Sequence, residues 1–503
     1  MRVLFINSNT ERSPWPVPPM GACSVASGAS EAGHSVQFLD LCFEERIEGA
    51  ILGAIEGFRP EIIAITVRNI DNLDWQKPVF YLETIKSRIV KTCRAHARCP
   101  IVLGGPAAGM MPKELLEYLG VDFLIRGDGE VAFLRLLEAI GSGRGLQTVP
   151  GLVYKDKESG QVHVGDPDRV SDLDSLPMPQ AHRWLDLKRY FNYNGSYGIQ
   201  TKRGCALTCS YCAYNQIEGS CYRLKSVPRI LREIASAIHE AKAPSIEFTD
   251  STFNIPLEHA LGICRALAER KFPVTFSTMG INPGAVTEEL FGLMKEGNFS
   301  EVSITPETGS AAMLRSLGKN FTLEQVARAA EISRKFNMPI VWYFMFGAPG
   351  ENRQTVRETL EFIAKHVPSN HLVLLVSGIR IFRGAPLEAI ARQEGQLAPD
   401  DNLLRPVWYR MGLSREEMSD LIDEALRRHY NYISLQDNLI PAPLLRAAYG
   451  VHHFLRMKRP LWQYLRYVRW LLCALRLPPH LLTQFSGPGR KPSPSESLDI
   501  RHP

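Results

Sequence analysis

The sequence predicts an α/β protein with three parts. A doubly wound, Rossmann-like domain comes first, and a partial parallel barrel of six strand–helix repeats and a helical carboxyl-terminal region follow it. Two observations support this prediction. Short, continuously apolar runs alternate with helical stretches, and such runs are typical of parallel strands buried on both faces. From residue 414 onward the pattern is helical and strand signals are absent.

The composition is that of a folded protein: 503 residues, 45% hydrophobic and 22% charged, with a net charge of +5. This length suggests about two to four domains. The charge is small and widely spread except near the carboxyl terminus, so we expect no nucleic-acid partner. An apolar run follows Met1 without a secretory leader, and ten cysteines are too sparse for a disulfide scaffold. We therefore expect a cytoplasmic location.

The Rossmann-like domain is expected over residues 1–145. Its apolar runs predict strands at residues 3–6, 36–39, 62–65, 101–103 and 123–125. Doubly wound domains bind ligands at the carboxyl ends of their strands. The candidate binding loops are therefore residues 7–19, 66–72, 104–112 and 127–130.

A hairpin and linker are expected over residues 146–197, and the barrel over residues 198–391. The barrel strands are predicted at residues 198–201, 245–249, 274–277, 301–305, 340–345 and 372–376. The site of such a barrel lies at the carboxyl ends of its strands. Residues 392–485 are expected to be helical, and residues 486–503 to form a disordered tail rich in Gly, Pro and Ser.

Three cysteines, Cys205, Cys209 and Cys212, lie within eight residues just after the first predicted barrel strand. Cysteine thiolates hold iron–sulfur clusters. Three of them on a four-iron cluster leave one iron open to an external ligand, as catalytic metal sites keep one position free. Gly204 relaxes the backbone where this loop must turn. The alternatives are three buried structural thiols or a zinc site, for which Cys221 is the main candidate as fourth ligand.

This Cys-x-x-x-Cys-x-x-Cys loop after the first strand of a partial barrel resembles that of the radical S-adenosylmethionine (SAM) superfamily. The resemblance implies a [4Fe–4S] cluster on the three cysteines, with the amino and carboxylate groups of SAM on the open iron. It also implies reductive cleavage of SAM to methionine and a 5′-deoxyadenosyl radical. The electrons would come from an external donor of the flavodoxin or ferredoxin type.

Other barrel residues match the same family. Tyr211 occupies the aromatic position before the last cysteine, where the family contacts the adenine. Asp250 falls where the second strand holds the methionine amino group, and Glu307 where the fourth strand reaches the ribose. Alternatively, these two carboxylates cap the helices that follow them. Two further segments resemble family turns: residues 347–351 and 381–387.

The amino-terminal domain resembles that of the superfamily class with a cobalamin-binding domain. The matching segments are residues 18–21, 33–36, 104–106 and 126–130. Glycines there let the backbone approach a large flat ligand and its phosphate-bearing tail. The residues expected to bind cobalamin are Gly104, Gly105, Gly127 and Glu130. The Asp-x-His-x-x-Gly motif that supplies a lower axial histidine elsewhere is absent, as it often is in this class.

Two polar segments allow alternative interpretations. Residues 66–72 place a dense polar cluster at a strand end, where side chains cap one another or where Arg68 and Asn69 face cobalamin or substrate. Residues 454–477 mix bulky apolar and cationic side chains. A helix of this kind lies on a membrane surface as a peripheral contact, covers an apolar site, or packs on the barrel with solvated arginines. No apolar stretch reaches the ~20 residues needed for a transmembrane segment.

Together the two resemblances imply a cobalamin-dependent [4Fe–4S] radical SAM methyltransferase. It would act on an unactivated carbon of a small or lipid-like biosynthetic intermediate. One alternative is a radical SAM enzyme that performs cyclisation, rearrangement or another radical step without methyl transfer. A non-catalytic cobalamin or metal sensor is a more distant one. A methylthiotransferase is disfavoured because a second cysteine trio and an RNA-binding module are missing. The sequence identifies neither the substrate nor a catalytic residue for hydrogen abstraction.

Overall fold

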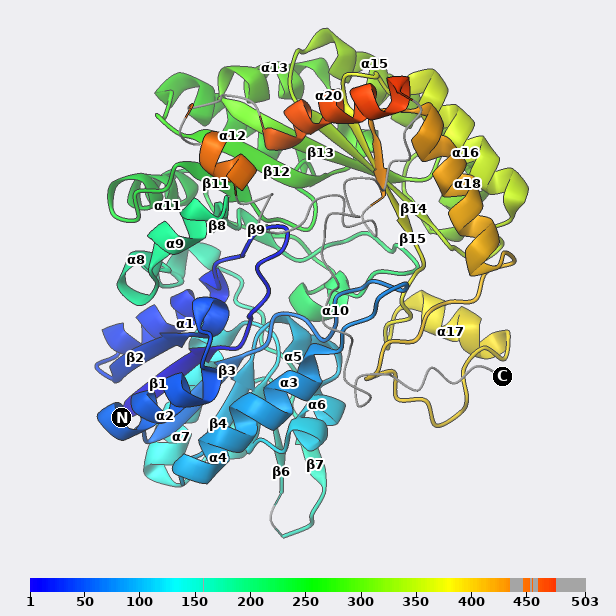
Figure 1. The fold of residues 1–503 in the computed structure, drawn as a ribbon. Coiled ribbons are helices and arrows are strands. Elements are labelled where there is room, and N and C mark those ends of the chain that lie inside the picture. Colours follow the sequence, from blue (N-terminus) through cyan, green and yellow to red (C-terminus); the bar gives the residue numbers. More distant parts are fainter. Residues whose placement is uncertain (157, 435–446, 453–454, 456–459, 476–503) are drawn as a thin grey trace.

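The computed structural model describes residues 1–503 except 157, 435–446, 453–454, 456–459 and 476–503. Two parallel-stranded α/β domains face each other, with the amino-terminal domain below the barrel in the view shown (Figure 1). The predicted fold class is confirmed. The predicted tail at residues 486–503 lies outside the described residues.

The amino-terminal sheet has the strand order β2-β1-β3-β4-β5-β6-β7. Its first five strands are parallel, and the predicted hairpin adds two antiparallel strands to its edge. The strands are β1 (Arg2–Asn7), β2 (Ser35–Asp40), β3 (Ile62–Thr66), β4 (Ile101–Gly104), β5 (Phe123–Ile125), β6 (Leu152–Lys155) and β7 (Val162–Val164). The α-helices are α1 (Met20–Glu31), α2 (Ile47–Phe58), α3 (Tyr81–Thr84), α4 (Lys91–His96), α5 (Pro106–Met110), α6 (Pro112–Leu119) and α7 (Gly129–Ser142).

Burial on both faces explains the continuous apolar runs of this sheet. Along β1, Val3 and Phe5 pack into one core with helices α1 and α7, whereas Leu4 and Ile6 pack into the opposite core with α2. A strand covered on both sides cannot show polar alternation. The carboxyl ends of β1, β3 and β4 remain uncovered by these helices and face the barrel (Figure 1).

The barrel sheet has the order β16-β15-β14-β13-β12-β11-β8, with all neighbours parallel. Its strands are β8 (Tyr197–Ile199), β11 (Ser245–Phe248), β12 (Thr275–Ile281), β13 (Phe299–Glu307), β14 (Ile340–Phe346), β15 (Leu372–Ser377) and β16 (Tyr432–Ser434). The main outer helices are α11 (Val227–His239), α12 (Leu257–Arg270), α13 (Glu288–Glu296), α15 (Leu323–Lys335), α16 (Arg353–His366) and α18 (Arg415–Arg428).

Shorter elements connect and cover these layers. They are α8 (Ala181–Trp184), α9 (Leu187–Asn192), β9 (Lys202–Arg203), α10 (Tyr214–Glu218), β10 (Arg223–Leu224), α14 (Ala311–Ser316), α17 (Pro386–Gln393) and α20 (Leu461–Ala474). Helix α20 crosses in front of the barrel strands in this view (Figure 1), and its Trp462 packs against Val341 and Leu372 on the sheet face turned away from the outer helices. None of the helices in the described ranges is both long and apolar enough to span a bilayer.

The expectation that strands are absent after residue 414 is wrong, because β16 forms a seventh barrel strand. It pairs with β15 through the partners Val373 and Tyr432, Leu374 and Ile433, and Leu375 and Ser434. Three residues are too few to produce a recognisable alternation. The strand therefore exists through pairing with a distant segment and not through a local pattern.

The polar loop after β3 anchors the amino-terminal domain to the barrel. Asp71 and Arg380 form an ion pair of 2.5 Å with both side chains at least 98% buried. Trp75 donates a hydrogen bond from Nε1 to Ser377 Oγ at 3.0 Å. Burial raises the pKa of Asp71 and lowers that of Arg380. The charge of Arg380 offsets the first shift only in part, and the charge of Asp71 likewise offsets the second. The pair therefore depends on both members being present.

We expect Asp71→Ala to destabilise the protein by about 3–5 kcal/mol, because it leaves Arg380 buried without a counter-ion. Urea unfolding monitored by tryptophan fluorescence measures the change. The control is Glu289→Ala, which breaks the exposed Arg265–Glu289 pair and should hardly move the midpoint. Equal effects of the two substitutions would contradict the anchoring role of Asp71.

Candidate active site

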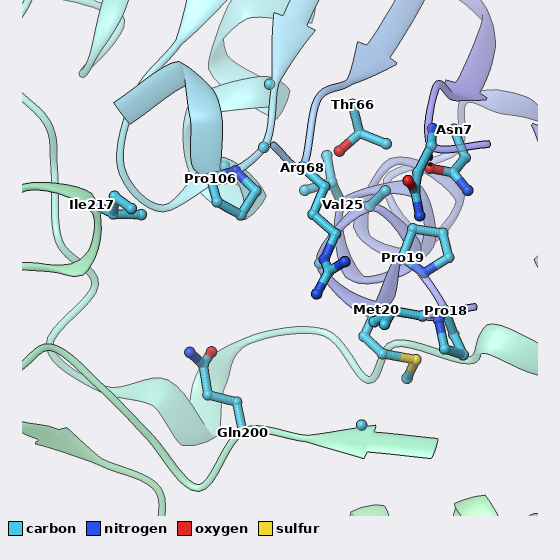
Figure 2. A pocket seen from close by; sticks show the side chains of 18 of the residues that line it. Asn7, Pro18, Pro19, Met20, Val25, Thr66, Arg68, Pro106, Gln200 and Ile217 are labelled. Atoms are coloured by element: carbon cyan, nitrogen blue, oxygen red, sulfur yellow. Dashed lines mark hydrogen bonds between the residues drawn. The ribbon is translucent and has the colours of Figure 1, made fainter. Parts of the chain in front are cut away.

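A cavity of about 420 Å³ lies between the two domains. Its walls come from the carboxyl ends of β1, β3 and β4, from the start of α1, and from β8, β11 and α10 of the barrel side. Figure 2 shows Asn7, Thr66 and Arg68 on one side and Gln200 on the other. A volume of this size is in the range of cofactor and ligand sites. The cavity thus lies between the strand ends of the two domains, which is where both kinds of fold bind ligands.

All but one of the predicted amino-terminal site residues line this cavity. Gly104, Gly105, Gly127, Glu130 and Arg68 do so, whereas Asn69 is exposed outside the lining. The Arg68 side chain extends from the loop after β3 into the space between the domains (Figure 2). The rule that ligands bind at strand ends therefore predicted the correct loop, but it did not distinguish Arg68 from Asn69. Their contacts to a cofactor stay predictions.

The two glycines after β4 suit a flat ligand. A Cβ on Gly104 would meet no atom within 4 Å, so the backbone there is open to the cavity. Gly105 has φ +101°, and a Cβ would lie 2.5 Å from the carbonyl oxygen of Val67. Only glycine fits this second position. These residues therefore fit a large cofactor such as cobalamin, whose approach requires bare backbone at the strand end.

Glu130 has partners inside the protein. Its carboxylate accepts hydrogen bonds from Arg203, at 2.6 and 3.1 Å, and from Ser24 Oγ at 3.2 Å. Burial acts to raise the pKa of Glu130, but Arg203 outweighs it and holds the pKa below its ordinary value. Glu130 is therefore an ionised link to the barrel at the edge of the cavity.

The cysteine loop follows β8 and β9 and starts with a constrained turn. Gly204 has φ +90°, and a Cβ there would lie 2.0 Å from the carbonyl oxygen of Cys221. The amide of Cys205 donates to the carbonyl of Gly219 at 2.9 Å, and the amide of Cys212 to that of Cys209 at 3.2 Å. Backbone contacts thus fix the loop at both ends.

The thiols of the loop influence one another electrostatically. Burial raises the pKa of Cys209, and raises that of Cys212 to about 11, with smaller contributions from the neighbouring cysteines. The three thiols therefore lie near one another. Across the described residues, however, no three Cys, His, Asp or Glu side chains converge as ligands of one ion would. Cys221, the candidate fourth zinc ligand, is exposed.

Lys319 is a site residue that the sequence analysis missed. Its Nζ lies 3.1 Å from Tyr211 Oη, 3.4 Å from Glu307 Oε1 and 3.8 Å from Cys209 Sγ. Tyr211 also donates to Glu307 Oε1 at 3.1 Å. No local pattern in Ser-Leu-Gly-Lys-Asn marks this lysine, because its partners lie 12 and 108 residues away. The structure thus brings two predicted SAM residues together around one unpredicted cation.

The helix-capping alternative for Asp250 and Glu307 is wrong. The helices that follow them begin at other residues, with Pro256 and Ser310 at their N-caps. Glu307 instead has φ +67° at the end of β13, a strained conformation for a side-chain-bearing residue. Glu307 thus remains available to the site.

Asp250 is held within the barrel. Its carboxylate accepts hydrogen bonds from the Thr201 amide at 2.7 Å and from Thr201 Oγ1 at 2.5 Å, and it lies 3.5 Å from Lys202 Nζ. The Asp250 side chain is fully buried. These contacts brace the segment before the cysteines, and contact of Asp250 with SAM stays a prediction.

Comparisons with known proteins agree with this geometry. A radical SAM superfamily model matches residues 199–363, and a B12 binding domain model matches residues 10–137. An uncharacterized methyltransferase from Pyrococcus horikoshii is 28% identical over 69% of this chain and 73% of its own. Hopanoid C-3 methylase from Methylococcus capsulatus is 26% identical over 64% of this chain and 60% of its own.

One solved structure has the same fold over nearly the whole chain. It is the radical SAM methyltransferase TsrM from Kitasatospora setae, solved with cobalamin and a [4Fe–4S] cluster bound. The TM-score is 0.79 at 21% identity, covering 94% of this chain and 98% of the other. The relative arrangement of the two domains is therefore a shared feature of the fold.

Replacement of Cys205, Cys209 or Cys212 by Ala is expected to abolish a stable cluster, because the cubane loses one of its three protein ligands and keeps only two thiolates. Anaerobic reconstitution followed by iron and sulfide analysis measures it, with about four irons per chain expected for the unchanged protein. Cys221→Ala is the matched control and should retain the cluster. Loss of iron in that control would instead show that Cys221 is a fourth ligand.

Proposed function

We propose that this chain, a radical SAM enzyme with an amino-terminal B12-binding domain, is a cobalamin-dependent methyltransferase acting at an unactivated carbon. One observation carries the proposal. A single cavity is bordered by the strand ends of the B12-binding domain and by α10, the helix that begins two residues after Cys212. Methyl transfer to carbon requires both cofactors to reach one substrate atom, and a shared cavity provides that geometry.

The cofactors, when bound, would supply reductive cleavage of SAM and transfer of its methyl group. The protein's own residues would then bind and orient. Cys205, Cys209 and Cys212 would hold the cluster, and Tyr211, Glu307 and Lys319 would surround SAM. Gly104, Gly105, Gly127 and Arg68 would face cobalamin. Closure of the cavity by two domains would keep water from the reacting groups.

We further propose that the enzyme works in a reducing compartment of the cell. The described cysteines are all free thiols, which suits a reducing compartment such as the cytoplasm. A small or lipid-like molecule would be the substrate. A flavodoxin- or ferredoxin-type protein would supply electrons, because SAM cleavage consumes one electron that the chain itself does not generate.

Anaerobic turnover tests the proposed function. The reconstituted protein is incubated with cobalamin, a low-potential reductant, SAM carrying a deuterated methyl group and a small-molecule extract of the host. A product that has gained the labelled methyl group, with Cys209→Ala inactive, is the expected outcome. SAM cleavage without corrinoid binding would favour a radical reaction without methyl transfer. Corrinoid binding without any SAM cleavage would favour a sensor.

Gly104→Val should weaken corrinoid binding by at least tenfold, about 1.4 kcal/mol, because the added side chain would occupy cavity space, and a Cβ there meets no protein atom within 4 Å. Cobalamin retained after gel filtration measures the effect. Gly57→Val adds the same atoms at an exposed position of α2, also with no atom within 4 Å of its Cβ, and should bind cobalamin normally. Normal binding by both variants would place the corrinoid elsewhere.

A further inference from the structure

The barrel lumen contains a polar layer where parallel barrels ordinarily hold bulky branched side chains. Gly198, Glu247, Ser277 and Glu301 are register partners on the consecutive strands β8, β11, β12 and β13. The residues that alternate with them pack in the core between sheet and helices; these are Ile246, Phe248, Phe276 and Val302. The polar layer therefore points to the opposite face, into the lumen.

Glu247 borders the cavity without a partner. Within the described part of the chain its carboxyl group has neither a hydrogen bond nor an ion pair, although it is partly buried. Burial and the nearby Glu301 raise the pKa of Glu247 to about 7, and Arg68 counters this only in part. A buried carboxylate without a partner is costly, so this position suits a ligand that supplies the missing donor.

Glu301 is the second acid of the layer. Burial raises its pKa, and Trp462 Nε1 of α20 donates a hydrogen bond to its Oε2 at 2.5 Å. The indole is a neutral donor, so it brings no positive charge to the layer. The layer thus holds two acids, and Arg68 across the cavity is the cation that counters Glu247.

A buried cluster of apolar side chains lies on the same face of the sheet as these acids. Val341, Leu372 and Leu374 form a buried cluster, with Tyr343, Ile433 and Trp462 packed against it. Along β14, Val341 and Tyr343 alternate with Trp342 and Phe344, which belong to the core between sheet and helices. The cluster therefore lies in the lumen. The lumen thus combines two acids with buried apolar side chains. The cavity that Glu247 borders also has apolar lining residues, such as Val25 and Phe133 on its amino-terminal side.

We propose that Glu247 binds the substrate, and that the substrate carries a protonated amine on an apolar or aromatic body. This inference rests on the proposed function and names the substrate class of the same site. An ammonium group supplies the hydrogen-bond donors that Glu247 lacks and offsets the repulsion between Glu247 and Glu301. A phosphate or carboxylate at this place would add negative charge beside the two acids and is disfavoured by the same electrostatics.

Three probes with one body and different head groups test the class: 2-phenylethylamine, 2-phenylethanol and phenylacetate. Equilibrium dialysis at pH 8 measures their binding to the cluster- and cobalamin-loaded protein. The amine should bind at least about tenfold more tightly than the alcohol, and phenylacetate weakest. Glu247→Gln should remove this preference. Glu258→Gln makes the same change at an exposed position of α12 and should preserve it.

The pH dependence separates direct binding from a structural role. Because Glu247 must ionise to pair with the ammonium, the affinity of the unchanged protein for the amine should rise between pH 6 and pH 8. The amine itself stays protonated over this range. The titratable or charged groups that face Glu247 are Glu301, Tyr343 and Arg68. Glu301→Gln should shift the rise to lower pH, because it removes a charge that raises the pKa of Glu247, whereas Glu247→Gln should show no rise.

Equal binding of the three probes, undetectable binding of the amine, or a Glu247→Gln protein with unchanged preference would overturn this inference. The cluster content, corrinoid content and methyl transfer of the unchanged protein are measured in the same preparations. If these are normal and the amine preference is absent, the substrate class is wrong and the proposed function stands. If the unchanged protein lacks corrinoid or methyl transfer, the proposed function itself fails.

Discussion

Arg203 ties the two domains together at the edge of the cavity between them. Its guanidinium contacts Asp128 at 3.1 Å and Glu130 at 2.6 Å, both in the loop and helix start after β5. Burial alone would lower the pKa of Arg203, but these carboxylates outweigh it and raise the pKa. Arg203 stands two residues before Cys205. One charged side chain therefore sets the position of the cysteine loop relative to the amino-terminal domain.

The site uses buried charge in two different ways. Around the cysteines, Lys319 pairs with Glu307, so a cation and an anion neutralise each other beside the expected place of SAM. In the lumen, Glu247 has no such partner among the residues that the structure describes, and its pKa is raised. Paired charges fix the geometry of the site, whereas an unpaired buried charge is stabilised only when a ligand of opposite charge binds. The distinction separates the residues that build the site from those that select what enters it.

Local sequence patterns predicted those features whose residues lie close together in the chain. The cysteine trio occupies eight residues, and the buried parallel strands appear as apolar runs because each is covered on both faces. The sequence did not reveal Lys319 or β16, whose partners are distant in the chain. It also placed Asp250 among cofactor residues, although the contacts of its carboxylate with Thr201 and Lys202 become visible only in the folded barrel. Register across three strands, not any motif, is what brings Glu247 and Glu301 into one layer.

The loop after β3 serves both domains, since it carries Arg68 into the cavity and Asp71 and Trp75 to the end of β15. The amino-terminal domain is thus no interchangeable module. A chimaera that receives this domain from a relative would need the matching Ser377 and Arg380 from the same donor. Without them the transplanted loop would lose its anchor, and Arg68, which lines the cavity, would lose its fixed position. Recombination between such enzymes should therefore succeed at crossover points that keep this loop and the end of β15 in one parental block.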